Sequence, residues 1–123
     1  MAKILIVDDS KTSRKFLRNM LEDAGHEIVS EAVNGVEGVE KFRLYKPDVV
    51  TMDITMPVMD GLEATFLIRQ FDENIPIIAL TANAFDSDKE AAFAVGCNHF
   101  MTKPLKKKEL MKLLSDFVEE RTF

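Results

Sequence analysis

Residues 4–9 read ILIVDD, an apolar run that ends in two aspartates. The pattern returns at residues 49–53, VVTMD, which end in a third aspartate. Runs this apolar are typical of parallel strands that helices cover on both faces. In open sheets of this kind, ligands bind at the carboxyl ends of the strands. We therefore expect Asp8, Asp9 and Asp53 to meet at one edge of a sheet and to form the functional site.

Three carboxylates at one place predict a metal site. They repel one another, and each resists ionisation unless a cation lies among them. Oxygen ligands at this density suit a hard divalent ion, with Mg²⁺ as the first candidate. The sequence therefore predicts phosphate chemistry with a bound metal.

Length and composition predict a single domain over residues 1–123. A chain of 123 residues buries a full core without disulfides, and its single cysteine excludes a disulfide framework. The formal net charge of −5 argues against a nucleic-acid partner, because proteins that bind nucleic acid carry basic patches. No apolar stretch approaches the roughly 20 residues that span a bilayer, and the run before Asp8 is too short for a signal peptide. We expect a soluble cytoplasmic protein without membrane insertion.

Strand patterns alternate with helical patterns along the whole chain. Helix-capping and helix-breaking residues mark the ends of the predicted helices. Ser10 marks the start of the first helix, and Gly25 marks its end. Five βα units in succession predict an α/β fold, with a parallel sheet, right-handed crossovers and helices on both faces. The expected strands are 4–7, 27–32 (an alternating edge strand), 48–52, 77–80 and 98–101. The expected helices lie between Ser10 and Gly25, between Asn34 and Pro47, and at 62–71, 85–95 and 106–119.

Two more strand ends carry side chains suited to phosphoryl transfer. Thr81 follows the fourth strand, and Lys103 follows the fifth. A carboxylate can attack phosphorus to give an acyl phosphate when a metal and a cation neutralise the charge on the phosphoryl oxygens. Asp9 and Asp53 are candidates for direct metal ligands, and Asp8 is a candidate for orienting a metal-bound water. Lys103 would grip one phosphoryl oxygen, and the Thr81 hydroxyl would contact another.

Four motifs carry a resemblance to a known family. They are IVDDS at 6–10, MDITMPVMDG at 52–61, LTAN at 80–83 and FMTKP at 100–104. In this order and spacing the chain resembles the receiver domain of two-component response regulators, in its stand-alone, chemotaxis-type form, over essentially all of its length. The resemblance implies a flavodoxin-like, doubly wound (βα)5 fold with five parallel strands in the order 2-1-3-4-5.

The resemblance also implies a role for each acidic residue. Asp53 is the expected phosphoacceptor. Asp8 and Asp9 are the expected acidic pocket for Mg²⁺, and the backbone carbonyl of Thr55 is a further expected ligand. The side chains of Thr55 and Asn83 lie beside the path of a hydrolytic water, so they should influence the lifetime of the phosphoryl group.

A second group of residues is implied as the part that senses the phosphoryl group. Lys103 is the expected sensing cation, followed by a cis bond to Pro104. Thr81 and Phe100 form the expected switch pair. Phe100 has no hydroxyl, so it cannot donate the hydrogen bond of the tyrosine that is frequent at this position in chemotaxis receivers. The expected supporting residues are Pro104, Asn83, Pro57 and Gly61.

The implied function is a phosphorylation switch in chemotaxis or a phosphorelay, and not an enzyme. The expected partner is a sensor histidine kinase or a histidine phosphotransfer domain, whose phosphohistidine gives its phosphoryl group to Asp53. The first helix and the loop after Lys103 are the expected docking surface. Phe16 lies at the border of the apolar stripe of that helix, so it is either a peripheral core residue or an exposed contact, and the resemblance favours a contact. A downstream protein target is expected to bind the fourth helix, the fifth strand and the last helix.

Three other functions compete with this hypothesis. A Mg²⁺-dependent aspartyl phosphatase of the haloacid dehalogenase type needs a second aspartate two residues after its nucleophile, where this chain has Thr55. A receiver-like binding module that is never phosphorylated usually lacks part of the acidic cluster or the lysine, and here all are present. The last alternative is a receiver excised from a hybrid histidine kinase or a transcription factor. A chain that runs from Met1 to Phe123 favours an independent protein instead.

Overall fold

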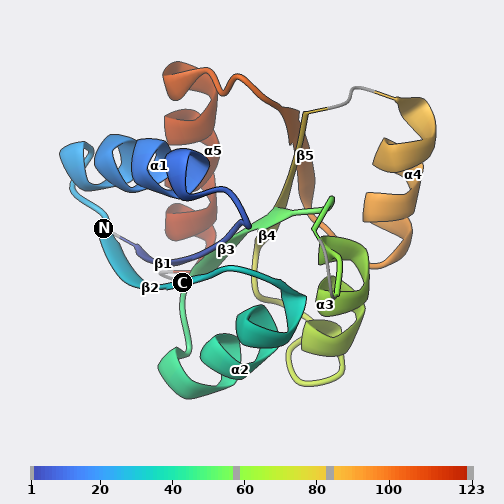
Figure 1. Ribbon diagram of the computed structural model, residues 1–123. Coiled ribbons are helices and arrows are strands. Elements are labelled where there is room, and N and C mark those ends of the chain that lie inside the picture. The colour runs from blue at the N-terminus through green and yellow to red at the C-terminus, as the bar shows by residue number, and fades with distance from the viewer. Residues whose placement is uncertain (1, 57–58, 83–84, 122–123) are drawn as a thin grey trace.

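Five parallel strands form the centre of the molecule, and each is followed by a helix (Figure 1). The structure, a computed structural model, describes residues 2–56, 59–82 and 85–121. The strands are β1 (Lys3–Val7), β2 (Glu27–Ala32), β3 (Val49–Asp53), β4 (Ile77–Thr81) and β5 (His99–Thr102). The helices are α1 (Lys11–Asp23), α2 (Gly35–Tyr45), α3 (Gly61–Arg69), α4 (Asp86–Ala94) and α5 (Lys107–Arg121). The predicted alternation of strand and helix is confirmed, and every predicted end lies within two residues of the observed one.

The strands form one sheet in the order β2-β1-β3-β4-β5, and every neighbouring pair is parallel. Val7 pairs with Met52 and Asp53 pairs with Leu80, so the carboxyl ends of β1, β3 and β4 lie side by side. This strand order is that of the doubly wound, flavodoxin-like fold and confirms the predicted fold class. It brings the residues at these three strand ends to one edge of the sheet.

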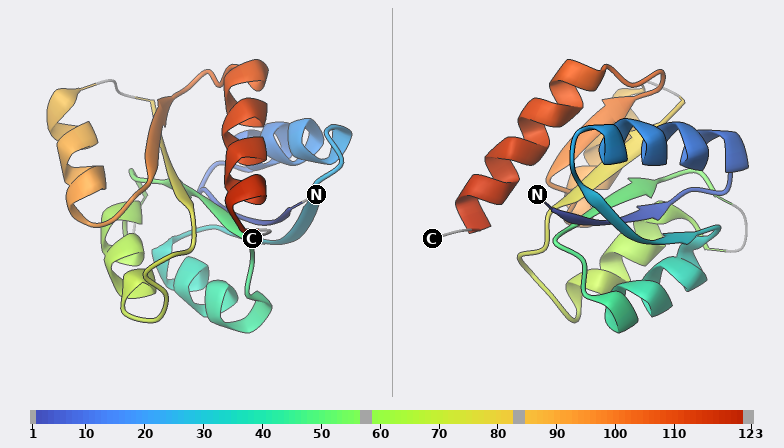
Figure 2. Two further views of the ribbon diagram at one scale, coloured as in Figure 1. Left: turned by 180° about the vertical axis from the view of Figure 1, so that it is seen from behind. Right: turned by 90° about the vertical axis from the view of Figure 1, so that its left-hand side faces the viewer.

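Helices cover both faces of the sheet (Figure 2), and an apolar core lies on each face between the sheet and its helices. On one face, α1 and α5 bury side chains such as Leu17 and Leu110. On the other face, α2, α3 and α4 bury Phe42, Ile68 and Ala92. The central strands β1, β3 and β4 are buried along almost their whole length, because helices cover both faces of the sheet there. In the described part of the chain, none of the helices combines the length and the apolar character needed to cross a membrane.

The edge strand β2 differs from the predicted alternation of buried and exposed residues. Glu27 is exposed, Ala32 is buried, and the four residues between them are half-buried. Both α1 and α2 contact this strand, and they lie on opposite faces of the sheet. The strand lies at the edge, as predicted, but helices approach both of its faces, and the polar side chain of Glu31 therefore meets protein groups.

The helix α4 is attached to the sheet by fewer buried residues than α1, α2 and α3. It buries Ala92, whereas each of the other three buries three or four residues. Side-chain oxygens of Ser10, Asn34 and Asp60 cap those three helices, but the N-cap residue of α4 is Phe85, whose side chain cannot accept a hydrogen bond from the helix. In Figure 1, α4 lies at the margin of the molecule, beyond β5. A single buried residue and an N-cap without a side-chain hydrogen bond predict that α4 is weakly held.

Candidate functional site

Three carboxylates meet at the carboxyl ends of β1 and β3. Asp8, Asp9 and Asp53 each offer an oxygen that lies within 4.8 Å of the other two. Asp8 and Asp53 are buried, and Asp9 is exposed. Three carboxylate oxygens at this spacing fit a hard divalent cation such as Mg²⁺. Because Asp9 is open to water, a cation can reach the cluster from that side.

Asp53, the last residue of β3, carries a charge that its surroundings compensate only in part. Its Oδ1 accepts a hydrogen bond from the Thr55 N–H at 2.9 Å. The pKa of the Asp53 carboxyl is raised to about 6, chiefly by burial, and the hydrogen bond from the Thr55 N–H opposes part of this rise. The charge of Asp8 contributes to the rise, and the charge of Lys103 opposes it. A cation among the carboxylates would favour the ionised form of Asp53.

Lys103 joins β5 to the acidic cluster. Its Nζ lies 2.8 Å from Asp8 Oδ2 and 3.9 Å from Asp53 Oδ2. The same ammonium donates to Ser13 Oγ at 3.3 Å, and the Lys103 backbone N–H donates to the Thr81 carbonyl at 2.8 Å. The lysine is thus held at the carboxyl edge of the sheet by its side chain and its backbone together.

The predicted switch residues lie at the ends of β4 and β5. Thr81 is fully buried at the last position of β4. Phe100 is half-buried in β5 and packs against the core beneath α2, α3 and α4. The Lys103–Pro104 peptide bond is cis, as the resemblance implied. Two residues that were predicted to support the site lie outside the described part of the chain: Pro57 and Asn83.

Gly61 allows the start of α3 to lie against the backbone of Asp53. A Cβ at this glycine would lie 2.1 Å from the Asp53 carbonyl oxygen, closer than any side chain can approach. The preceding residue, Asp60, caps α3, because its Oδ1 accepts a hydrogen bond from the Glu63 N–H at 2.9 Å. The turn after β3 therefore needs an aspartate followed by a residue without a side chain.

An apolar groove of about 250 Å³ lies beside the acidic cluster, between α1 and the loop from β5 to α5. Phe16 lines it from α1 and is 53% exposed, while Leu105 lines it from the loop. Phe16 is thus an exposed residue and not a peripheral part of the core, which was the alternative for this side chain. Lys103 lines the groove and also contacts Asp8, so a molecule in the groove would lie next to the carboxylates.

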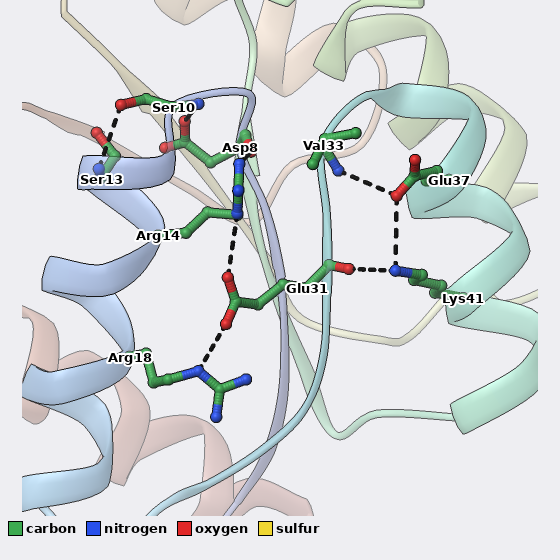
Figure 3. A network of polar contacts seen from close by, with 9 residues as sticks. All are labelled: Asp8, Ser10, Ser13, Arg14, Arg18, Glu31, Val33, Glu37 and Lys41. Carbon is green, nitrogen blue, oxygen red and sulfur yellow. Dashed lines mark hydrogen bonds and ion pairs between the residues drawn. The ribbon is translucent and has the colours of Figure 1, made fainter.

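The structure adds two residues to the site that the sequence interpretation missed. Ser13 contacts Lys103, and Arg14 donates from Nη1 to the Asp8 carbonyl at 2.9 Å. Arg14 also pairs with Glu31 of β2 (Figure 3). The predicted helix begins directly after Ser10, so residues 13 and 14 lie in its first turn, close to the acidic pair. This position is a sequence signal for the contacts of Ser13 with Lys103 and of Arg14 with Asp8. The pairing with Glu31 depends on the strand order and has no local signal.

The profile of the response regulator receiver domain matches residues 4–115. The chain belongs to this family. This receiver domain is 44% identical to the chemotaxis protein CheY of Halobacterium salinarum over 117 residues, which cover 94% of this chain and 97% of that protein. It is therefore a receiver domain of the CheY-like response regulators, which act in two-component signalling.

Two solved structures are similar to this receiver domain over most of its length. One is the CheX–CheY–BeF3–Mg²⁺ complex from Borrelia burgdorferi, with a TM-score of 0.88 and 33% identity, covering 94% of this chain and 88% of that one. The other is the receiver domain of the sensor histidine kinase PA1611 from Pseudomonas aeruginosa, with a magnesium ion coordinated in the active site cleft. Its TM-score is 0.88 at 32% identity, covering 96% of this chain and 98% of that one. Both of these crystals hold magnesium, and one of them holds a protein partner.

Proposed function

We propose that this chain is a cytoplasmic phosphorylation switch in which Asp53 takes a phosphoryl group from a phosphohistidine in a Mg²⁺-dependent step. The observation that supports the proposal most strongly is the gathering of three carboxylates and Lys103 at one edge of the sheet. A carboxylate oxygen that attacks phosphorus forms an acyl phosphate, and the histidine nitrogen leaves. Catalysis of such a transfer consists mainly of positioning and of charge stabilisation, which these groups supply.

The acidic cluster is the proposed Mg²⁺ site. Asp8, Asp9 and Asp53 would hold the ion, and the Thr55 carbonyl would be a further ligand. Bound Mg²⁺ supplies positive charge that stabilises the phosphoryl oxygens as they approach Asp53. The ammonium of Lys103, which already lies within 3.9 Å of Asp53, supplies a second positive charge. Both charges offset the repulsion that three carboxylates exert on an incoming phosphate.

A histidine kinase or a histidine phosphotransfer domain is the proposed donor. The apolar groove between α1 and the loop from β5 to α5 supports this proposal, because it lies beside the carboxylates and exposes Phe16. An apolar helix surface of the donor could cover Phe16 and Leu105 and bring its phosphohistidine over Asp53. In this proposal the chain acts as one receiver domain over residues 1–123.

The proposed output surface is formed by α4, β5 and α5, where a downstream protein target would bind. The hydroxyl of Thr81 is the group that would turn toward a phosphoryl oxygen, and the space it leaves would be filled by Phe100. Phe93 of α4 and Phe85, the N-cap residue of this helix, are exposed and would take part in the altered surface. A phosphoryl group can shift this equilibrium only through contacts that differ between the two states, and those are the contacts with Thr81 and Lys103.

The experiment is labelling with acetyl phosphate in the presence of Mg²⁺, read by intact mass. The wild type should gain one phosphoryl group, and Asp53→Asn should gain none. Asp48→Asn is the matched control, because it makes the same Asp-to-Asn change at the residue that precedes β3, at the opposite end of the strand from Asp53. This variant should be labelled like the wild type. A chelator should abolish labelling of the wild type.

Labelling of Asp53→Asn at the level of the wild type would contradict the assignment of the acceptor. Labelling that a chelator leaves unchanged would contradict the need for Mg²⁺. A steady release of inorganic phosphate over many turnovers would instead support a phosphatase. The exposed Thr55 argues against that outcome, because such phosphatases have a carboxylate at this position.

A further inference from the structure

All four polar groups of Asp8 have partners. Its N–H donates to the Ala32 carbonyl at 3.0 Å, and its Oδ1 accepts a hydrogen bond from the Ser10 N–H at 2.9 Å. Its Oδ2 contacts Lys103, and its carbonyl oxygen accepts a hydrogen bond from Arg14 Nη1 at 2.9 Å. The Arg14 contact is the one that holds the peptide group between Asp8 and Asp9, so it acts on both residues of the acidic pair.

Arg14 is itself oriented by Glu31 of the edge strand β2 (Figure 3). Arg14 Nε lies 3.0 Å from Glu31 Oε1, and the two side chains are only 14% and 27% exposed. Glu31 Oε2 pairs with Arg18 Nε at 2.6 Å, and the Glu31 carbonyl accepts a hydrogen bond from Lys41 of α2. Each carboxylate oxygen of Glu31 therefore has its own arginine, and the contact of Oε1 with Arg14 does not depend on Arg18.

We propose that Arg14, held by Glu31, is a positioning residue for the Mg²⁺ site. The inference rests on the proposed function, because it takes the acidic cluster as the site of Mg²⁺. Groups that orient metal ligands without touching the metal commonly change its affinity, and a carboxylate set that is loose by about 1 Å binds poorly. Arg14 restrains the peptide that joins two of the three carboxylates, and Glu31 extends this restraint to β2.

The charge of Arg14 and its positioning role have opposite effects on Mg²⁺ affinity. A guanidinium near the acidic cluster repels a divalent cation, so loss of the charge alone would strengthen Mg²⁺ binding. Loss of the restraint on the Asp8–Asp9 peptide would weaken it. The sign of the change in Mg²⁺ affinity therefore separates the two roles.

The test is a Mg²⁺ titration of the full chain, followed by the amide chemical shifts of the acidic cluster at constant ionic strength. Arg14→Ala should weaken Mg²⁺ binding by about tenfold. Arg14→Lys keeps the charge but cannot make both contacts of the guanidinium, and it should weaken binding to a similar extent. Arg18→Ala is the matched control, because Arg18 pairs with the same Glu31 and has no described contact with Asp8. It should change the affinity by less than about twofold.

A second readout needs no Mg²⁺. Hydrogen exchange at the Ser10 amide, which is bonded to Asp8 Oδ1, should be faster in Arg14→Ala and unchanged in Arg18→Ala. Thermal unfolding of each variant shows that it is folded. Unchanged or tighter Mg²⁺ binding in Arg14→Ala would overturn the inference, as would equal weakening in Arg18→Ala. A wild type without Mg²⁺-dependent shifts at Asp8, Asp9 and Asp53 would overturn the proposed metal site as well, so the two failures are distinguishable.

Discussion

Lys103 Nζ lies 2.8 Å from Asp8 Oδ2 but 3.9 Å from Asp53 Oδ2, so the lysine bonds to the aspartate of the predicted metal pocket rather than to the predicted phosphoacceptor. The side chain of Asp8 is 1% exposed, and a carboxylate so deeply buried needs a positive partner. Lys103 supplies that partner in the structure, and a divalent ion bound by the acidic cluster would supply a second positive charge. The two cations therefore act on the same carboxylate.

The first prediction concerns this pair. Lys103→Met keeps the length of the side chain and leaves Asp8 without its cation, so the free energy of unfolding should fall by about 2 kcal/mol when Mg²⁺ is chelated. Added Mg²⁺ should restore more stability to this variant than to the wild type, because no ammonium then repels the ion. Urea unfolding with and without Mg²⁺ measures both effects. Lys106→Met, at a side chain that is 78% exposed, should respond to Mg²⁺ like the wild type. An equal response in Lys103→Met would contradict the prediction.

The second prediction is a pH dependence of stability that originates at Asp53. The pKa of its carboxyl rises from the ordinary value of 3.8 to about 6 on folding. The folded chain therefore binds more protons than the unfolded chain between these values, and stability from this group is lost as the pH rises through about 6. Asp53→Asn removes the charge at nearly constant size. With a chelator present it should raise the free energy of unfolding by about 2 kcal/mol at pH 7 and by little at pH 4.

Urea unfolding at the two pH values checks this second prediction. Asp116→Asn changes an exposed carboxylate of α5 and should show no comparable gain at pH 7. Mg²⁺ should narrow the difference between Asp53→Asn and the wild type, because a bound cation favours the ionised carboxylate. A gain in stability that is equal at pH 4 and pH 7 would show that the charge of Asp53 is not its source.

The third prediction concerns Thr51, which lies beneath the site in β3. It is fully buried, pairs with Ile6 and Ile78 in the neighbouring strands, and its hydroxyl has no hydrogen-bond partner among the described residues. Thr51→Val replaces this hydroxyl by a methyl group and should raise the free energy of unfolding by about 1 kcal/mol. Thr65→Val is the control, because the Thr65 hydroxyl lies 3.7 Å from the thiol of Cys97 and should yield no gain. Destabilisation of Thr51→Val would reveal a polar partner for that hydroxyl.

The fourth prediction concerns the close approach at Gly61. A methyl group there would collide with the Asp53 carbonyl, so Gly61→Ala should lower the free energy of unfolding by about 3 kcal/mol and slow phosphorylation by acetyl phosphate. Gly38→Ala is the matched control. Its Cβ would meet the side chain of Val7 at 3.0 Å, which can shift, and α2 gains about 1 kcal/mol of helix propensity from alanine. If the two variants unfold alike, the contact with Asp53 is not what requires Gly61.

The positions of the strand ends could be predicted from the sequence, because apolar runs and the residues that follow them are local features. Asp8, Asp53 and Thr81 are brought together as soon as the strands are parallel and in the order 2-1-3-4-5. The strand order itself came from the resemblance and not from the pattern of residues. The roles of the site residues remain predictions that the labelling experiment tests.

What could not be predicted depends on side chains that meet across the fold. The pairing of Arg14 with Glu31 joins residues 17 positions apart and requires β2 to lie beside β1. The half-burial of β2 has the same origin, since helices approach it from both faces. The direction of Lys103, toward Asp8 rather than Asp53, depends on ångström-scale geometry that no residue pattern carries.

The single buried residue of α4 sets an energy scale for the proposed signal. One phosphoryl group forms a few hydrogen bonds to charged groups, each worth about 1.5–3 kcal/mol, and only the part that differs between two conformations can move the protein. An element held by a large apolar area would not respond to so small a difference. Ala92 is the one residue that α4 buries, so the free energy needed to reposition this helix is within the range that one phosphoryl group can supply.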